Sequence, residues 1–237
     1  MNMPRSHSGT SLSPVLQFGA RRVPRFLLLL IAALVFLVAA PLLGVGPVGI
    51  MGGKLILAIM LLVAVAELDR NQFRIGLVIA VVAIATDWVG AIAQPSGVSL
   101  AAIVIRAVFF LYVGSVVLYR VLRQPTVTLD TIAGASCVYL FIGFMWAMFF
   151  SLLDHLEPGS LQFPETWARL PLGNDTARYV YFSFVTLTTL GYGDIVPKTV
   201  DASGLVVAEA VVGQLYLTVL IARLVGLHLA RRNEPTD

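Results

Sequence analysis

Long apolar runs separated by short polar segments occupy most of the chain from residue 26 onward. The runs carry few charges and are bounded by glycine, proline or arginine, a pattern typical of membrane-spanning helices. A span needs about 20 apolar residues, and most of the runs approach that length. The pattern therefore predicts an all-α membrane protein with six transmembrane helices, at residues 26–43, 54–68, 75–93, 100–122, 131–153 and 202–230.

The polar segments between the runs predict turns and tails. Repeated glycine around Pro47 predicts an extracellular turn over residues 42–53. The first 24 residues are rich in serine, proline and arginine, which predicts a disordered basic tail. Arginines before the first run resemble the start of a signal peptide, but the run is longer than a usual signal and further spans follow it, which favours a retained helix.

A long interval separates the last two runs. Its first part, residues 154–171, is polar and predicts an extracellular turret. A short helix is predicted at 177–188, with Asn174, Asp175 or Thr176 as its N-cap. This helix is too short to cross a bilayer, so we expect it to enter and leave the membrane from one side.

Composition and charge agree with a membrane protein. The 237 residues are 58% hydrophobic and 12% charged, about half the charged fraction of a soluble domain. Most lysine and arginine residues fall on one side of the predicted spans, and the positive-inside rule places both termini in the cytoplasm, in a cell membrane. The excess of positive charge therefore does not indicate a nucleic-acid partner.

Few residues of the sequence are candidates for catalysis or for metal binding. The single cysteine, Cys137, lies within an apolar run and is interpreted as a buried apolar residue. No cluster of metal-ligand spacing and no nucleophile with a base is present in the sequence. The sequence therefore favours a protein that is not an enzyme and needs no cofactor.

The segment from Thr188 to Asp194 reads Thr-Thr-Leu-Gly-Tyr-Gly-Asp and directly follows the short predicted helix. Glycine at alternate positions permits left-handed and extended backbone, so that successive carbonyl groups can point the same way. A ring of such carbonyls can replace the water around a cation. The alternative is an ordinary glycine-rich turn, which would have to carry this whole motif between two apolar helices by coincidence.

This segment resembles the selectivity filter of potassium channels, whose loop reads TVGYG where Thr189–Gly193 reads TLGYG. Residues 181–188 resemble the pore helix of that family, and Asp194 with Pro197 resembles the family's Asp-x-x-Pro exit. Gly213 falls where the family has a hinge glycine in its inner helix. The resemblance covers roughly residues 130–230.

The resemblance implies which residues conduct. Potassium ions would bind the backbone carbonyls of a filter formed by Thr189, Leu190, Gly191, Tyr192 and Gly193. One chain has one such loop and no repeat of it, so a closed ring requires a homotetramer in membrane lipid. The support of the filter would come from Thr188, Asp194, Tyr181 and Phe182, with Tyr192 packed against the last two and the Tyr181 hydroxyl bonded to Asp194.

The sixth helix would line the path below the filter. Steps of about one turn from the Gly213 hinge place Leu217, Ile221 and Val225 on one face, where they would form the cavity and an apolar gate. Packing against the fifth helix is the alternative for these three. Glu209 lies one turn before the hinge, and an ionisable residue at that depth is a functional candidate or a hydrogen-bonded structural one.

The first four helices resemble a voltage-sensing domain that lacks its charges. In voltage-gated relatives the fourth helix carries arginine at every third position, whereas Arg106 is followed at these spacings by Phe109, Tyr112, Ser115 and Leu118. We therefore expect weak or absent voltage dependence. Counting residues places Asp87 and Arg106 at similar depth, roughly 9 Å from the outer surface, which predicts an ion pair between them.

The sequence thus predicts a four-helix sensor-like domain at 25–123, a linker at 124–130, a pore domain at 131–230 and a short cytoplasmic tail at 231–237. Three alternatives to a potassium-selective channel stay open. A weakly selective cation pore would normally disturb the central Gly-Tyr-Gly, and a Trk-type transporter would carry four divergent repeats in one chain. The third alternative is a membrane subunit that does not conduct.

Overall fold

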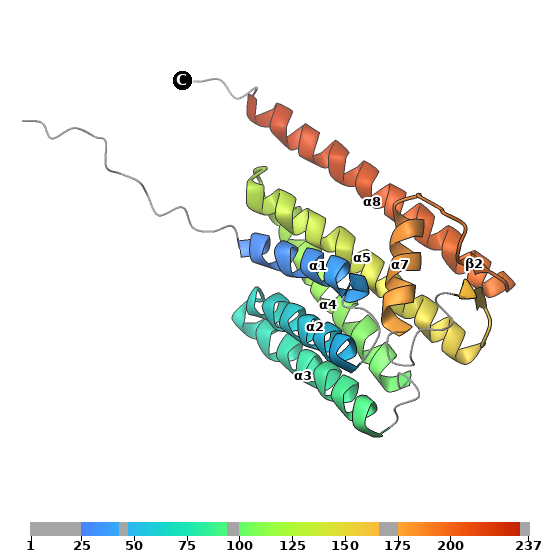
Figure 1. The fold of residues 1–237 in the computed structure, drawn as a ribbon. Coiled ribbons are helices and arrows are strands. Elements are labelled where there is room, and N and C mark those ends of the chain that lie inside the picture. The colour runs from blue at the N-terminus through green and yellow to red at the C-terminus, as the bar shows by residue number, and fades with distance from the viewer. Residues whose placement is uncertain (1–24, 43–46, 94–99, 166–174, 233–237) are drawn as a thin grey trace, which may run out of the picture.

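The structure is a computed structural model, and it describes residues 25–42, 47–93, 100–165 and 175–232. These residues are almost entirely helical (Figure 1). The helices are α1 (Arg25–Leu42), α2 (Pro47–Ala66), α3 (Arg70–Ala93), α4 (Leu100–Arg123), α5 (Leu129–Leu156), α7 (Asp175–Leu187) and α8 (Val200–Arg232). Two short strands, β1 (Leu161–Gln162) and β2 (Val196–Pro197), pair in antiparallel fashion.

The largest error of the sequence prediction concerns the second helix. The glycine-rich stretch was expected to be a turn as far as residue 53, but α2 begins at Pro47 and includes these glycines. Proline is well tolerated in the first turn of a helix, where its missing N–H has no intrahelical partner to lose. The charged run was expected to precede a third helix starting at residue 75, whereas α3 begins at Arg70. The predicted tails at 1–24 and 233–237 lie outside the described residues.

Four helices are long and apolar enough to cross a membrane, judged by length and composition. They span Arg70–Val89, Leu100–Arg123, Leu129–Leu156 and Val200–Leu227. The first two helices contribute shorter apolar segments, Arg25–Ala39 and Met51–Ala66. The prediction of an all-α membrane protein is therefore confirmed, while the number of six spans stays a prediction for α1 and α2.

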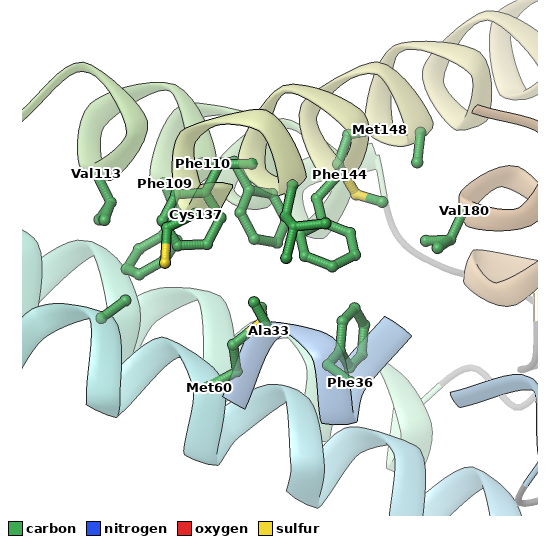
Figure 2. Packing of buried hydrophobic residues seen from close by; sticks show 14 of the residues in the cluster. Ala33, Phe36, Met60, Phe109, Phe110, Val113, Cys137, Phe144, Met148 and Val180 are labelled. Carbon is green, nitrogen blue, oxygen red and sulfur yellow. The ribbon is translucent and has the colours of Figure 1, made fainter. Parts of the chain in front are cut away.

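Helix α5 lies at the centre of the fold. It packs along α4 and against α1, α7 and α8, and most of its length is buried. Figure 2 shows Phe109 and Phe110 of α4 and Phe144 of α5 facing Ala33, Phe36 and Met60 of α1 and α2. Phe144 makes edge contacts with Phe36 at 5.2 Å and with Phe184 of α7 at 5.3 Å between ring centres. This aromatic chain connects α1 to the short helix α7 through α5.

Helix α8 lies at one edge of the molecule, and α2 and α3 lie at the opposite edge (Figure 1). It contacts α5, α7 and β2. Much of its surface is exposed in the single chain, including Val207, Val211, Leu215, Ile221 and Val225. One face of α8 is therefore not covered by any other described element of the chain.

Candidate functional site

Helix α7 is seated on α5 through a glycine. A Cβ at Gly143 would come within 2.6 Å of the ring of Phe184, so only glycine allows this close approach. Phe182 is buried and packs edge-on against Phe150 of α5, with 4.8 Å between ring centres. Phe182 thus helps to fix α7 on α5, while the predicted packing of Tyr192 against Tyr181 and Phe182 stays a prediction.

The filter segment, residues 188–194, has an alternating backbone. Positive φ angles occur at Thr189 (59°), Gly191 (57°) and Gly193 (76°), while Leu190 and Tyr192 do not have them. Thr189 is the single non-glycine residue with positive φ among the described residues, and this conformation costs about 1–2 kcal/mol for an L-residue. The alternation that the glycine pattern predicted is present in the structure.

The amide groups of this segment turn back toward α7. Thr189 N–H donates to Thr186 O at 2.9 Å, and the N–H groups of Leu190 and Gly191 both donate to Val185 O, at 2.9 and 3.2 Å. In a planar trans peptide the carbonyl points opposite to the N–H that follows it. The carbonyls of residues 188, 189 and 190 therefore point away from α7, toward the open side of the chain.

The exit of the filter segment is fixed by side chains and by the short strand pair. Tyr181 Oη donates to Asp194 Oδ2 at 2.7 Å, and Ile195 N–H donates to Asp194 Oδ1 at 3.0 Å. Partial burial and the bond to the Asp194 carboxylate raise the pKa of Tyr181 to about 12. Lys198 N–H donates to Ser160 O at 2.8 Å next to the β1–β2 pair. The expected hydroxyl donor to Asp194 is thus in place.

The filter side chains themselves are uncovered in one chain. Leu190 is 55% exposed and Tyr192 is 66% exposed. Large apolar and aromatic side chains beside a fixed, carbonyl-lined backbone are costly to leave in water. This part of the site is therefore complete only when another surface covers it.

The predicted cavity residues of α8 differ in their exposure within the single chain. Gly213 is in contact with α7, because a Cβ there would lie 2.6 Å from Leu187 Cδ1 and 3.0 Å from Leu187 O. Ile221 and Val225 are exposed, whereas Leu217 is only half-exposed. Glycine at 213 is thus explained by close helix packing, a reason that the sequence did not indicate.

A contact between two buried polar residues, Ser183 of α7 and Glu209 of α8, was not predicted from the sequence. Ser183 Oγ lies 2.7 Å from Gly143 O and 2.5 Å from Glu209 Oε1. Glu209 is 0% exposed in the single chain. Only the apolar surroundings of Glu209 marked it in the sequence, and nothing there named Ser183 as its partner.

The predicted ion pair of the front half is formed. Arg106 Nη1 lies 3.2 Å from Asp87 Oδ1, and the two side chains are 5% and 8% exposed. The same Nη1 atom lies 3.4 Å from Thr176 Oγ1 at the start of α7, and Lys54 Nζ donates to Asp87 O at 2.8 Å. This buried charge cluster therefore holds α2, α3, α4 and the start of α7 together. Of the three N-cap candidates, Asp175 and Thr176 lie inside α7, and Asn174 lies outside the described residues.

Metal-ligand chemistry is not evident in the described part of the chain, where no group of three or more histidine, cysteine, aspartate or glutamate side chains is gathered. The arrangement that remains is a set of backbone carbonyls held at the end of a short helix. Such carbonyls can coordinate a bare cation but supply no acid, base or nucleophile.

Comparison with known proteins gives one match. Residues 126–227, from the start of α5 to near the end of α8, match a family described as ion channel. The matched residues make up less than half of the chain and leave α1–α4 outside. No curated protein and no solved structure matches the chain. Residues 126–227 are accordingly similar to an ion channel domain, and further apolar helices lie on the N-terminal side of these residues.

Proposed function

We propose that the protein is a potassium-selective ion channel that works as a homotetramer in a cell membrane. The observation that carries this proposal is the sequence Thr-Leu-Gly-Tyr-Gly at Thr189–Gly193, held at the end of α7 with the amides of residues 189–191 turned toward α7 and the carbonyls of residues 188–190 turned away from it. In the proposed assembly the carbonyls of Thr189, Leu190, Gly191 and Tyr192 bind dehydrated potassium ions along a four-fold axis. Gly193 allows the chain to turn out of the filter.

The tetramer is supported by what a single chain leaves exposed. The filter segment and the face of α8 with Val207, Val211 and Leu215 lie on the open side of the molecule. One loop supplies a quarter of a ring, so four copies close it. In this assembly neighbouring chains cover Tyr192 and Leu190, and α8 lines the inner cavity with Ile221 and Val225 on its exposed side.

Voltage does not drive this channel in our proposal. Arg106 is the one arginine within the apolar part of α4, and it is paired with Asp87 and enclosed. Moving one charge across the membrane contributes about 2.3 kcal/mol per 100 mV, so a sensor needs several movable charges. The two termini lie in the cytoplasm by the distribution of arginine, and the filter then lies in the outer half of the membrane.

Passive flux tests the proposal. Purified protein in liposomes loaded with potassium should release potassium into a sodium solution when a proton carrier is added, because protons then enter and balance the charge of the potassium that leaves. Equal fluxes of sodium and potassium would indicate a non-selective cation channel, and no flux from a correctly assembled tetramer would indicate a subunit that does not conduct. Chemical cross-linking of the same sample should end at four chains, and a smaller limit would contradict the assembly.

A further inference from the structure

Glu209 and Ser183 form a buried polar contact between α8 and α7 that the conduction proposal does not use. Ser183 Oγ lies 2.5 Å from Glu209 Oε1 and 2.7 Å from Gly143 O of α5. Ser183 and Glu209 are both 0% exposed within one chain. Neighbouring chains of an assembly therefore do not reach this contact, and its chemistry is set by one chain alone.

The two short contacts require two protons. The carbonyl of Gly143 has none to give, and a serine hydroxyl carries one. If Ser183 donates to Gly143 O, the contact with Glu209 needs a proton on the carboxyl group. If Ser183 donates to Glu209 instead, two bare oxygen atoms face each other at 2.7 Å. Only the first arrangement satisfies both contacts.

The surroundings of the carboxyl group also favour the acid form. No described residue forms an ion pair with Glu209, and Glu209 Oε2 is buried without a hydrogen-bond partner. A buried, unpaired carboxylate is far more costly than a buried carbonyl-like oxygen without a donor. The titratable side chain that faces it from α5 is Tyr139, whose hydroxyl donates to Leu187 O at 3.2 Å.

Other titratable groups of the elements packed against Glu209 are directed elsewhere. On α7, Tyr179 Oη donates to Asp154 Oδ2 at 2.6 Å and Tyr181 Oη to Asp194. On α8, Arg223 donates to carbonyls at the end of α4, and Asp201 lies in the first turn. Strand β2, Val196–Pro197, has no titratable side chain.

The contact lies where it can act on the filter. Glu209 and Gly213 are one turn apart on α8, and they touch Ser183 and Leu187, which are one turn apart on α7. Between these two points lies Val185, whose carbonyl holds the amides of Leu190 and Gly191. A shift of α8 relative to α7 would therefore reach the filter amides through a single helical turn.

We propose that Glu209 is a positioning residue in its protonated, neutral form, and that this acid hydrogen bond fixes α8 against the pore helix α7 so that the filter keeps its conducting geometry. Alkaline solution transfers the proton of the Glu209 carboxyl group to hydroxide, which forms water. The single proton of Ser183 then cannot serve both Gly143 O and the Glu209 carboxylate, and the contact that holds α8 on α7 is lost. Conduction of the channel then decreases as the pH rises. This inference rests on the proposed function only for its readout in ion flux.

Infrared spectroscopy tests the protonation without any assumption about conduction. The difference between wild type and Glu209→Gln at neutral pH should contain the carbonyl band of a protonated carboxyl group. In the wild type this band should vanish as the pH is raised. Absence of the band from a folded wild-type protein overturns the proposal, whether or not the protein conducts.

Potassium flux tests the positioning role. Below the pH range in which tyrosines normally ionise, wild-type flux should fall as the pH rises, by about tenfold per pH unit once ionisation of Glu209 begins. Glu209→Gln keeps a donor toward Ser183 and should conduct without this dependence. Ser183→Ala should lose flux at every pH, whereas Ser203→Ala, an exposed serine of α8 bonded to Thr199 O, should match the wild type. Identical pH profiles for wild type and Glu209→Gln would contradict the proposal.

Discussion

The front half of the molecule, α1–α4, and the channel half, α5–α8, satisfy their polar groups in different ways. In the front half the buried charges of Asp87 and Arg106 find each other within one chain. In the channel half the carbonyls of residues 188–190 point away from α7, and Tyr192 is left 66% exposed. A single chain thus pairs the buried charges of Asp87 and Arg106 but leaves the filter segment uncovered, and in the proposed tetramer neighbouring chains cover it.

The front half and the channel half also differ in the kind of surface that they expose. The front half exposes branched aliphatic side chains such as Leu28, Val38 and Val78, which suit lipid. The channel half exposes a glycine-rich backbone with positive φ angles together with one face of α8. Substitutions in the front half should therefore change stability, whereas substitutions in the filter should change conduction with little effect on the folded chain.

Gly191→Ala should have the largest effect on function. Alanine at φ +57° costs about 1–2 kcal/mol in each chain, and the relief of that strain would turn a carbonyl out of the ring. We expect potassium flux in liposomes to be lost while the tetramer persists. Gly159→Ala is the matched control, because φ there is +86° with open space around the added methyl group, outside the filter. Equal fluxes from the two variants would contradict the role of the filter.

Asp87→Ala should have the largest effect on stability. It leaves the Arg106 guanidinium buried without its carboxylate, which lowers the free energy of unfolding by about 3–5 kcal/mol. Thermal unfolding of the purified protein measures this loss. Replacing both partners by leucine should restore much of the stability.

The control for that prediction is Asp69→Ala. Its pair with Arg120 involves a carboxylate that is 71% exposed, and exposed pairs contribute about 0–1 kcal/mol. A loss for Asp87→Ala no larger than the loss for Asp69→Ala would show that the front half does not depend on its buried pair.

Gly213→Ala should lower stability by about 1–3 kcal/mol, because the added methyl group meets Leu187 side-chain and backbone atoms. The displacement of α8 from α7 should also reduce flux, so this change affects both properties. Gly204→Ala, on the same helix with open space around it, should instead be neutral or stabilising. A flux defect in both variants would assign the effect to helix flexibility and not to the contact with Leu187.

Tyr181→Phe should have the smallest effect, about 1 kcal/mol at a largely exposed contact with Asp194. The pKa of Tyr181 is raised from 10.0 to about 12, so its hydrogen bond stabilises the folded protein fully below pH 10 and is lost between pH 10 and 12. In the Glu209→Gln background, flux should decline over that alkaline range. The decline should be absent when Tyr181→Phe is added, and its persistence would assign it to another group.

The sequence predicted the backbone conformation at Gly191 and Gly193 and the Asp87–Arg106 pair because both depend on the spacing of residues along the chain. Alternating glycines at 191 and 193 dictate backbone conformation, and equal depths in antiparallel helices bring two charges together. The orientation of α8 could not be predicted in the same way, because it is apolar around most of its circumference and has no polar face to set its rotation. The contact of Glu209 with Ser183 and the packing role of Gly213 both depend on that rotation.

The start of α2 was missed for a different reason. Proline and repeated glycine near residue 47 normally mark a turn, but surrounding apolar residues and the absence of competing water favour intrahelical hydrogen bonds in a membrane protein. The short strands β1 and β2 were also beyond the sequence, because two residues carry no detectable alternation. The strand pair is determined by a partner more than 30 residues away in the sequence, whereas the start of α2 is determined by its apolar surroundings.

The central claim is that four copies of Thr189–Gly193 form a potassium-selective path. The most direct measurement is the reversal potential of the purified protein in a planar bilayer, with a solution rich in potassium on one side and one on the other in which sodium replaces most of the potassium. The account predicts a reversal potential close to the potassium equilibrium value, nearly independent of the direction of the voltage ramp. A reversal potential near zero in these conditions would contradict it.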